Sequence, residues 1–465
     1  MSENEVKPLD YNRRDFLKGG SVATLMGLMG GVPLFAKPGA EPVGESKPDT
    51  AKYKVAIIGL GRWGREILNT LTLAPGAKPG YQVEVAGICD NYPSALRRAG
   101  ELVPGAIKTE DYTTLLANKD IPAVIIATPT HKHAAIVIAA LKAGKHVYCE
   151  APLANTIEEA RAIALAAKDA PKQIFQAGLQ DRSDPERLFL LPFIREGNLG
   201  KNLFTRGQYH KKYSWRQQSP NAQREKDLNW CLDKTTSLGL LGETGIHPLD
   251  QATWFYNQKP AAITAFGSVM AYAEDGRDVA DTVQAVCEFR GGARAMYDAT
   301  LGNSFEANYE VFYGTNGAIL IRDSKAWMFK ETDSPLFGWE VYARKTQFYT
   351  EFQTTGISLM AGASKGAVTP AKEGDAKPAL SGALFSALGS FVRNCNDYTN
   401  AITDYTDNFG DDAEGLVKHL AEKVHRRAAA GYLEGYQATV TVVKANEALL
   451  TGKRVEIPRE LYELK

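Results

Sequence analysis

The stretch Val55-Ala-Ile-Ile-Gly-Leu-Gly-Arg-Trp-Gly64 decides the fold of this chain. A short apolar run ends in three glycines, and a helix is expected over Arg65–Leu73. The first glycine permits a tight turn, the second lets the backbone approach a diphosphate, and the third allows close packing of helix on strand. The helix N-terminus offers N–H groups and a positive dipole to the anion. The residues expected to bind a dinucleotide here are Gly59, Gly61, Arg62, Trp63 and Gly64.

A second apolar run, Val83–Cys89, ends in Asp90, near the position where a ribose-binding acid belongs. A carboxylate there accepts hydrogen bonds from the adenosine ribose and repels a 2′-phosphate, so we expect NAD rather than NADP. Arg97 and Arg98 follow closely and would weaken that preference if they reached the ribose, so NADP stays an alternative. The competing interpretation is an ordinary strand–helix turn with a solvated aspartate.

Composition describes a globular chain of 465 residues, 44% apolar and 23% charged, which is long enough for two domains. The formal net charge is zero, with 54 basic and 54 acidic side chains, so no field favours nucleic acid or an anionic membrane. The five cysteines are scattered and include no C-x-x-C pair. We therefore expect neither a metal site nor a disulfide framework.

The N-terminus is expected to be a targeting signal rather than part of the folded domains. Asn12-Arg-Arg-Asp-Phe-Leu-Lys18 precedes a mild apolar stretch, and the pattern resembles a twin-arginine signal peptide over residues 1–36, with Asn in place of Ser or Thr. Its five glycines make it a poor bilayer anchor, so no membrane anchoring is expected in the mature form. This route exports folded proteins, for example to the periplasm. Because NAD is scarce there, we expect a tightly held cofactor that is recycled within the active site.

Residues 37–52 are rich in Pro, Gly and Lys and are expected to form a linker or arm. Over residues 53–180, short apolar runs alternate with helical stretches, which is typical of a parallel sheet covered on both faces. We therefore expect a Rossmann domain here. Its predicted strands are Lys54–Ile58, Val83–Cys89, Ala123–Ala127, His146–Cys149 and Gln173–Ala177.

Residues 181–465 are expected to form an α+β domain with a mostly antiparallel sheet. Residues 361–378 are expected to be a flexible loop, Ala413–Leu450 to be helical, and Arg454–Ile457 to form a last strand. The predicted strands of the sheet are Leu203–Tyr209, Ala262–Val269, Thr282–Phe289, Ala293–Ala299 and Tyr309–Tyr313.

Four segments together resemble the Gfo/Idh/MocA oxidoreductase family. They are the glycine turn with Asp90, the segment Ala127-Thr-Pro-Thr-His-Lys-His133, the segment Ala143-Gly-Lys-His-Val-Tyr-Cys-Glu-Ala-Pro-Leu153, and the segment Gly242-Glu-Thr-Gly-Ile-His-Pro-Leu-Asp250. The family reads a-T-P-x-x-x-H, A-G-K-H-V-x-x-E-K-P-L and D-x-G-x-H-x-x-D in the last three. The resemblance implies a Rossmann domain followed by an α+β domain with an open sheet. The second domain would bind a carbohydrate or polyol as substrate, and its sheet would pack into a homodimer or homotetramer.

The resemblance also assigns site residues. Thr128, Pro129 and His133 would contact the cofactor, and Glu150 would lie against the nicotinamide ribose. His247 matches the family's active-site histidine, Glu243 stands where the family has Asp, and Asp250 is a candidate for substrate contact or for a structural role.

The family's lysine in E-K-P is replaced by Ala151, which cannot donate a proton or a hydrogen bond. His247 would then take the role, with Glu243 four residues earlier on the same helical face to orient it. Alternatively Lys211, Lys212, Tyr209 or His210 would reach the reacting hydroxyl; these residues form a dense run of protic groups that is otherwise a solvated strand end.

Three functions remain open at this point. The first is an exported oxidoreductase acting on a secondary hydroxyl of a sugar or polyol. The second is a redox-neutral glycosidase that oxidises, eliminates, hydrates and reduces in one site, because NAD-dependent glycosidases related to the family also lack the lysine. The third is a sugar-binding relative without catalysis.

Overall fold

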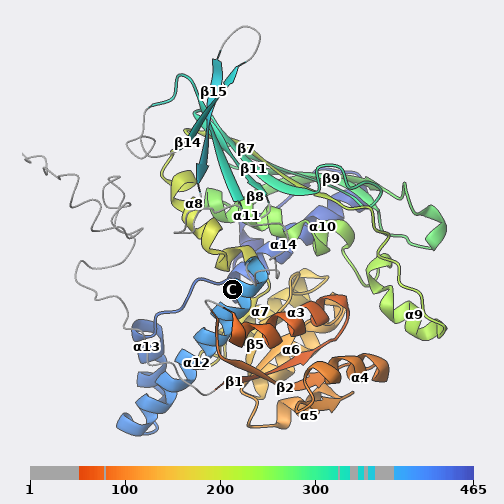
Figure 1. The fold of residues 1–465 in the computed structure, drawn as a ribbon, viewed down its shortest axis with the longest axis vertical. Coiled ribbons are helices and arrows are strands. Elements are labelled where there is room, and N and C mark those ends of the chain that lie inside the picture. The colour runs from red at the N-terminus through yellow and green to blue at the C-terminus, as the bar shows by residue number, and fades with distance from the viewer. Residues whose placement is uncertain are drawn as a thin grey trace, which may run out of the picture.

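The computed structural model describes residues 52–77, 80–322, 325–335, 344–349, 354–361 and 382–464. The predicted signal peptide, the linker up to residue 51 and the predicted loop from residue 362 to 378 lie outside the described residues. Two sheets dominate the structure, one beside the other, with helices between them (Figure 1).

The first sheet is parallel throughout, with the strand order β3-β2-β1-β4-β5-β6. This order reverses between β1 and β4, which is where Rossmann folds bind dinucleotides. The predicted parallel sheet is confirmed, and only the short β3 was not predicted. Its strands are β1 (Tyr53–Ile58), β2 (Val83–Cys89), β3 (Ile107–Thr109), β4 (Ala123–Ile126), β5 (His146–Cys149) and β6 (Phe175–Ala177).

Helices cover both faces of this sheet. The helix after the glycine turn begins at Arg62, three residues earlier than predicted. The helices are α3 (Arg62–Leu73), α4 (Pro93–Leu102), α5 (Tyr112–Ala117), α6 (His133–Lys142) and α7 (Ile157–Lys168). The Thr156 side chain accepts a hydrogen bond from the Glu159 N–H at the start of α7, as expected of a capping box.

The second sheet has ten strands in the order β14-β15-β13-β12-β11-β7-β10-β9-β8-β16, and only β7 with β10 pairs in parallel. The predicted, mostly antiparallel sheet is confirmed. Its strands are β7 (Asn202–His210), β8 (Pro260–Ser268), β9 (Thr282–Phe289), β10 (Arg294–Thr300), β11 (Asn308–Gly314), β12 (Gly317–Arg322), β13 (Lys325–Glu331), β14 (Arg344–Tyr349), β15 (Thr354–Ala361) and β16 (Val455–Glu456).

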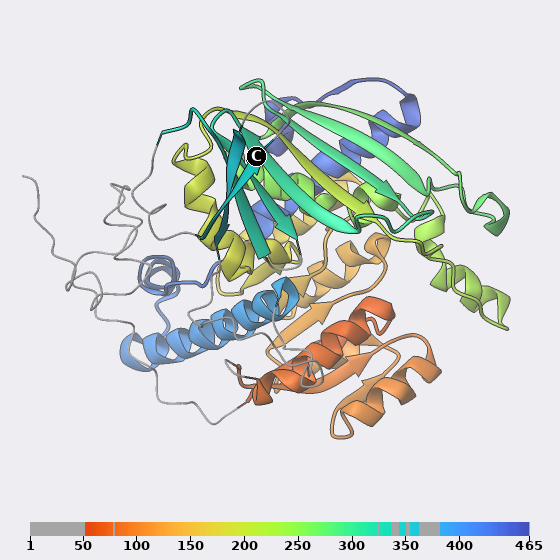
Figure 2. The same cartoon turned by 45° about the horizontal axis from the view of Figure 1, so that its top comes forward.

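One face of the second sheet is covered by helices that lie between it and the Rossmann domain (Figure 2). Gly207 in β7 marks the contact, because a Cβ there would lie 2.5 Å from the Pro248 side chain. The opposite face carries exposed apolar side chains, among them Phe266 and Met296. The helices of this part are α8 (Pro185–Arg195), α9 (Ala222–Leu228), α10 (Gly239–Glu243), α11 (Ile246–Tyr256), α13 (Ala413–Lys423) and α14 (Tyr432–Thr451).

Packing crosses the predicted domain boundary at residue 180. The long helix α12 (Ala383–Phe409) buries Leu388, Phe391 and Tyr398 in the same apolar cluster as β1 and β2. The Gln176 side chain donates a hydrogen bond to the Ala387 carbonyl, 2.9 Å away. The Rossmann domain is therefore completed by a helix from the distant C-terminal part of the chain. Within the described residues, no helix is both long and apolar enough to cross a membrane.

We predict that Gly64→Ala destabilises the fold by about 1–3 kcal/mol, because its Cβ would lie 1.9 Å from the Gly59 carbonyl oxygen. Gly61→Ala is the matched control, since no atom lies within 4 Å of the Cβ it would gain. Urea unfolding followed by far-ultraviolet circular dichroism compares the two variants. Equal unfolding midpoints for both variants and the wild type would contradict this packing.

Candidate active site

The glycine turn has the geometry that a dinucleotide requires. Gly59 adopts a φ of +97°, and a Cβ there would lie 2.6 Å from the Ala127 carbonyl oxygen. The turn is thus pressed against the loop that follows β4. At Gly61, in contrast, nothing lies within 4 Å of the position that a Cβ would occupy. The backbone is therefore open for the close approach of a diphosphate beside the N-terminus of α3.

Asp90 ties the end of β2 to this turn. One carboxylate oxygen accepts a hydrogen bond from the Leu60 N–H at 2.8 Å, and the other accepts one from the Tyr92 N–H at 2.9 Å. Arg97 and Arg98 are exposed on α4. The cation nearest to Asp90 is Arg224 of α9, whose Nη2 lies 4.0 Å from the carboxylate.

The loops after β4 and β5 carry buried polar atoms that have no hydrogen-bond partner among the described residues. Two of them are Thr128 Oγ1 and Glu150 Oε1. Burial raises the pKa of Glu150 to about 7. Unsatisfied buried acceptors are costly, and the hydroxyl and amide groups of a nicotinamide riboside are donors that would satisfy them. The residues present therefore fit the dinucleotide that the fold implies. Pro129 follows Thr128 and directly precedes the short turn Thr130–Lys132.

His133 has a different role from the predicted one. Its two ring nitrogens lie 2.9 Å from the Thr128 carbonyl and 3.0 Å from the Pro152 carbonyl, and its side chain is 1% exposed. Burial lowers its pKa to about 4, so the ring is neutral and donates to one carbonyl at a time. His133 thus holds together the loops that follow β4 and β5, and its ring offers no free atom to a cofactor.

Glu243 and His247 do not lie on one helix, which corrects the predicted arrangement. The helix α10 ends at Glu243, and α11 begins at Ile246, so the spacing of four residues does not place the two side chains on one helical face. Gly245 lies in the break, where a Cβ would be 2.8 Å from the Tyr297 ring. The Thr244 hydroxyl is 2.7 Å from the Tyr297 hydroxyl, so β10 fixes the break in place.

The contacts of Glu243 place it against the Rossmann domain. The Thr130 hydroxyl lies 3.3 Å from one carboxylate oxygen, and the Ser237 hydroxyl lies 3.2 Å from the same atom. Burial raises the pKa of Glu243 to about 7, and these two donors oppose the rise. The carboxyl group is consequently poised near neutrality, where it can either give or take a proton.

His247 lies at the first turn of α11 and is partly exposed. Burial lowers its pKa, while the negative charges of Asp181 and Asp250 oppose that effect. Its ring makes no hydrogen bond to another described residue. A neutral imidazole that keeps a free nitrogen is able to accept a proton.

Three other predicted residues, Tyr209, His210 and Lys211, lie in different environments. Tyr209 is on the face of β7 that also carries Gly207, which is the face toward α11. His210 points to the opposite face, where Asp298 lies 2.8 Å from its Nε2, so its prediction as a substrate ligand is wrong. Lys211 is exposed just after β7, and its side chain makes no hydrogen bond or ion pair with another described residue.

Asp250 forms a buried ion pair with Arg182, which gives it a structural role. Both carboxylate oxygens accept hydrogen bonds from Arg182, each at 2.8 Å, and the aspartate is 6% exposed. Such a bidentate pair fixes the orientation of both side chains. Thr130, Ser237 and Asp181 were not predicted, although Thr130 falls within the quoted Ala127–His133 segment.

Comparison with known proteins identifies the family of the chain. Residues 53–178 match the sequence model described as "Oxidoreductase family, NAD-binding Rossmann fold", and residues 192–320 match the "GFO/IDH/MocA C-terminal domain". The chain belongs to the Gfo/Idh/MocA family. Its first domain is therefore an NAD-binding Rossmann domain.

Among curated relatives, the levoglucosan dehydrogenase of Pseudarthrobacter phenanthrenivorans is 32% identical over 46% of this chain and 58% of the relative. The inositol 2-dehydrogenase of Salmonella typhimurium is 30% identical over 44% of this chain and 55% of the relative. The chain thus spans a little more than half the length of these relatives. The scyllo-inositol 2-dehydrogenase (NAD(+)) of Bacillus subtilis is 28% identical over 58% of this chain and 74% of the relative.

Solved structures share the fold. A complex of levoglucosan dehydrogenase with NADH and levoglucosan superposes with a TM-score of 0.63 at 23% identity, covering 88% of this chain and all of that one. The aldose-aldose oxidoreductase of Caulobacter crescentus, complexed with glycerol, superposes with a TM-score of 0.59 at 19% identity, with the same coverage.

We predict that Glu243→Gln flattens the dependence of stability on pH. The folded pKa is raised above that of the unfolded chain, so the folded protein holds more protons between about pH 4.5 and 7. Stability contributed by this group is therefore lost as pH rises through that window. Urea unfolding at pH 5 and pH 8 should show a smaller loss for the variant than for the wild type.

The control for this measurement is Glu422→Gln, which removes an exposed carboxylate of α13. It should follow the wild-type pH dependence. A Glu243→Gln protein with the full wild-type loss between the two pH values would rule out a buried, proton-retaining carboxyl group.

Proposed function

We propose that the protein is an NAD-dependent oxidoreductase that oxidises a secondary hydroxyl of a sugar, polyol or sugar derivative. One observation carries the proposal: the break between α10 and α11 is held against the loop after β4 through Thr130 and Glu243. This contact sets an ionisable carboxyl group at the edge of the sheet where the nicotinamide end of a dinucleotide binds.

The chain's own residues supply the acid–base chemistry. His247, neutral because burial lowers its pKa, takes the proton of the substrate hydroxyl. Glu243, with hydrogen bonds from Thr130 and Ser237, buffers the site with a carboxyl group poised near neutrality. The bound nicotinamide supplies the hydride acceptor. Glu150 would hold its ribose, and the open backbone at Gly61 would hold the diphosphate.

The relatives support the substrate class. Two of them are named for levoglucosan and inositol, which are carbohydrate and cyclitol molecules with secondary hydroxyls. We extend that class, rather than a particular substrate, to this chain.

The exposed apolar face of the second sheet supports assembly as a homodimer or homotetramer. Light scattering would test this assembly, and a monomer at micromolar concentration would contradict it.

Export and tight cofactor binding are further parts of the proposal. The twin arginines Arg13 and Arg14 support transport of the folded protein, which would leave the cytoplasm with NAD bound. Replacing both by Lys should retain the protein in the cytoplasmic fraction. Unchanged export of that variant would end this part of the proposal.

The second candidate is the redox-neutral glycosidase, which Ala151 favours, because a residue without a proton-transfer group stands where the family has lysine. The two functions differ in their products. A dehydrogenase yields NADH and a ketone, whereas the glycosidase releases an aglycone with no net NADH.

The experiment is a screen of sugars, polyols and aryl glycosides in which NADH and organic products are both followed. We predict that His247→Ala lowers kcat at least about 100-fold, because general base catalysis contributes 10²–10⁴ in rate. NADH affinity should stay within about twofold of the wild type. His210→Ala is the control, since that ring faces the other side of the sheet and should leave kcat unchanged.

Wild-type turnover retained by His247→Ala would remove the imidazole from the reaction. Failure of the wild type to bind NAD or NADP would end the proposal as a whole.

A further inference from the structure

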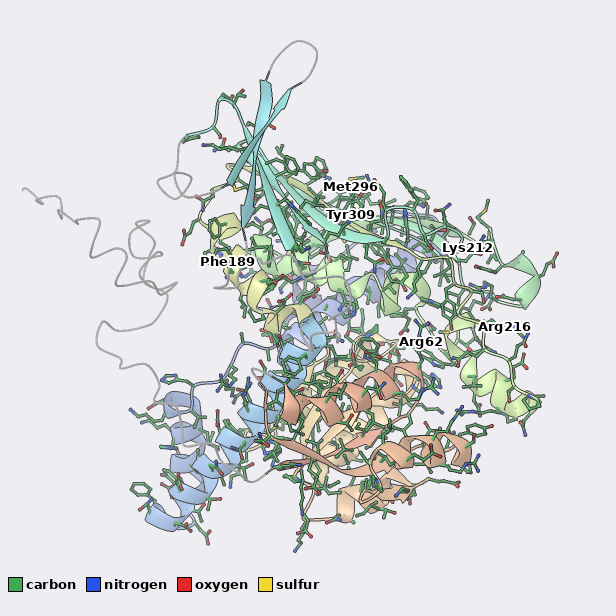
Figure 3. All side chains as sticks on the ribbon, viewed as in Figure 1. Arg62, Phe189, Lys212, Arg216, Met296 and Tyr309 are labelled. Carbon is green, nitrogen blue, oxygen red and sulfur yellow. The ribbon has the colours of Figure 1, made fainter. Side chains whose placement is uncertain are left out.

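Residues 213–236 cross from the end of β7 to the start of α10 and reach over the Rossmann domain. We call this segment the strap. Its helix α9 projects from the second domain toward α3 and α4 in Figure 1. In Figure 3, the labelled Arg62 lies on the Rossmann side, and the labelled Arg216 lies on the strap. The segment lies at the edge of the sheet where the carboxyl ends of the parallel strands meet.

Two contacts attach the strap to the loops after β1 and β2. The guanidinium of Arg62, the first residue after Gly61, stacks on the Tyr213 ring at 4.7 Å. Arg224 of α9 stacks on the Tyr92 ring at 4.2 Å, and its Nη1 donates to the Asn91 side chain at 3.3 Å. In a Rossmann fold, these loops hold the diphosphate and the adenosine ribose.

Two more contacts attach the strap to the loops after β4 and β5. The Trp230 ring lies 6.2 Å from the His131 ring, centroid to centroid. The Asn155 side chain donates a hydrogen bond to the Thr236 carbonyl at 2.5 Å. The strap therefore reaches four strand-end loops, which together line the path of a dinucleotide from adenosine to nicotinamide.

Contacts within the strap hold its two halves together. Asn229 accepts a hydrogen bond from the Gln217 N–H and donates one to the Gln217 carbonyl, and these two bonds link the first half of the strap to the second. Arg216 pairs with Glu225 within the segment. No residue of α9 is buried, so the hold of this helix on the Rossmann domain depends on polar and cation–π contacts rather than on a shared core.

We propose that the strap encloses the bound dinucleotide and limits its exchange, with Arg224 fastening it over the adenosine end. This inference rests on the proposed function and deepens it, because it gives a physical basis for a cofactor that stays bound between turnovers. Ser237 follows the strap directly in the chain and donates a hydrogen bond to Glu243, so closure of the strap also positions the carboxyl group of the site.

The experiment measures the rates at which NADH associates with and dissociates from the full-length protein, by stopped-flow fluorescence with excess NAD as the displacing ligand. Arg224→Gln removes the stacking and the charge. We expect both rates to rise at least tenfold, because an unfastened strap admits and releases the dinucleotide more freely. Arg224→Lys, which keeps the charge but loses the planar stacking, should be intermediate.

The matched control is Lys226→Gln, which removes a positive charge from the same helix at an exposed side chain that makes no hydrogen bond or ion pair to the described residues of the Rossmann domain. Its rates should equal those of the wild type. Hydrogen–deuterium exchange gives a second readout: NADH should slow exchange over residues 213–236 in the wild type and in Lys226→Gln, but much less in Arg224→Gln.

Each outcome decides the inference. If only dissociation accelerates and exchange over the strap is unchanged, Arg224 is a simple cofactor ligand and the strap does not gate. If the wild type binds NADH and Arg224→Gln matches it in both rates, the inference is overturned while the proposed function stands. If the wild type binds no NADH, both the proposed function and the proposed role of the strap are contradicted.

Discussion

The contact between the glycine turn and the loop after β4 is the constraint on which the rest of the structure depends. Gly59 must turn with a positive φ directly beneath the Ala127 carbonyl, and Gly64 must lie against the Gly59 carbonyl. These close approaches set the start of α3 beside the switch in strand order. Every further feature of the site, from Asp90 to the break before α11, is arranged around that edge of the sheet.

Much of the fold could be predicted because its signals are local. The runs Val83–Cys89 and His146–Cys149 are mostly buried strands with apolar residues close together in sequence, and the predicted bounds of both are confirmed. The completion of the Rossmann core by α12 could not be predicted in the same way. That packing joins Phe391 to residues more than 300 positions earlier, and it depends on tertiary fit rather than on a pattern.

The site was predictable where a motif specifies backbone and less so where it specifies side-chain contacts. The motifs located Glu150, Glu243 and His247, but helical spacing gave the wrong relation between the last two, because Gly245 interrupts the helix against Tyr297. Tyr209 and His210 are neighbours in β7, so their side chains point to opposite faces of the sheet. Treating the run of protic residues as one group overlooked this alternation. Thr130 and Ser237 could not be predicted as site residues, because their role is to donate hydrogen bonds to the Glu243 carboxyl group, and that contact depends on the tertiary structure.

In the proposed function, the replacement of lysine by Ala151 leaves proton transfer to Glu243 and His247, whose pKa values are shifted by burial. We propose that these two groups meet the nicotinamide at one place. The most direct test is a crystal structure of the protein with NADH. We expect the diphosphate over Gly61 and the nicotinamide between Glu150 and His247. A dinucleotide bound elsewhere, or an imidazole turned away from the nicotinamide, would contradict it.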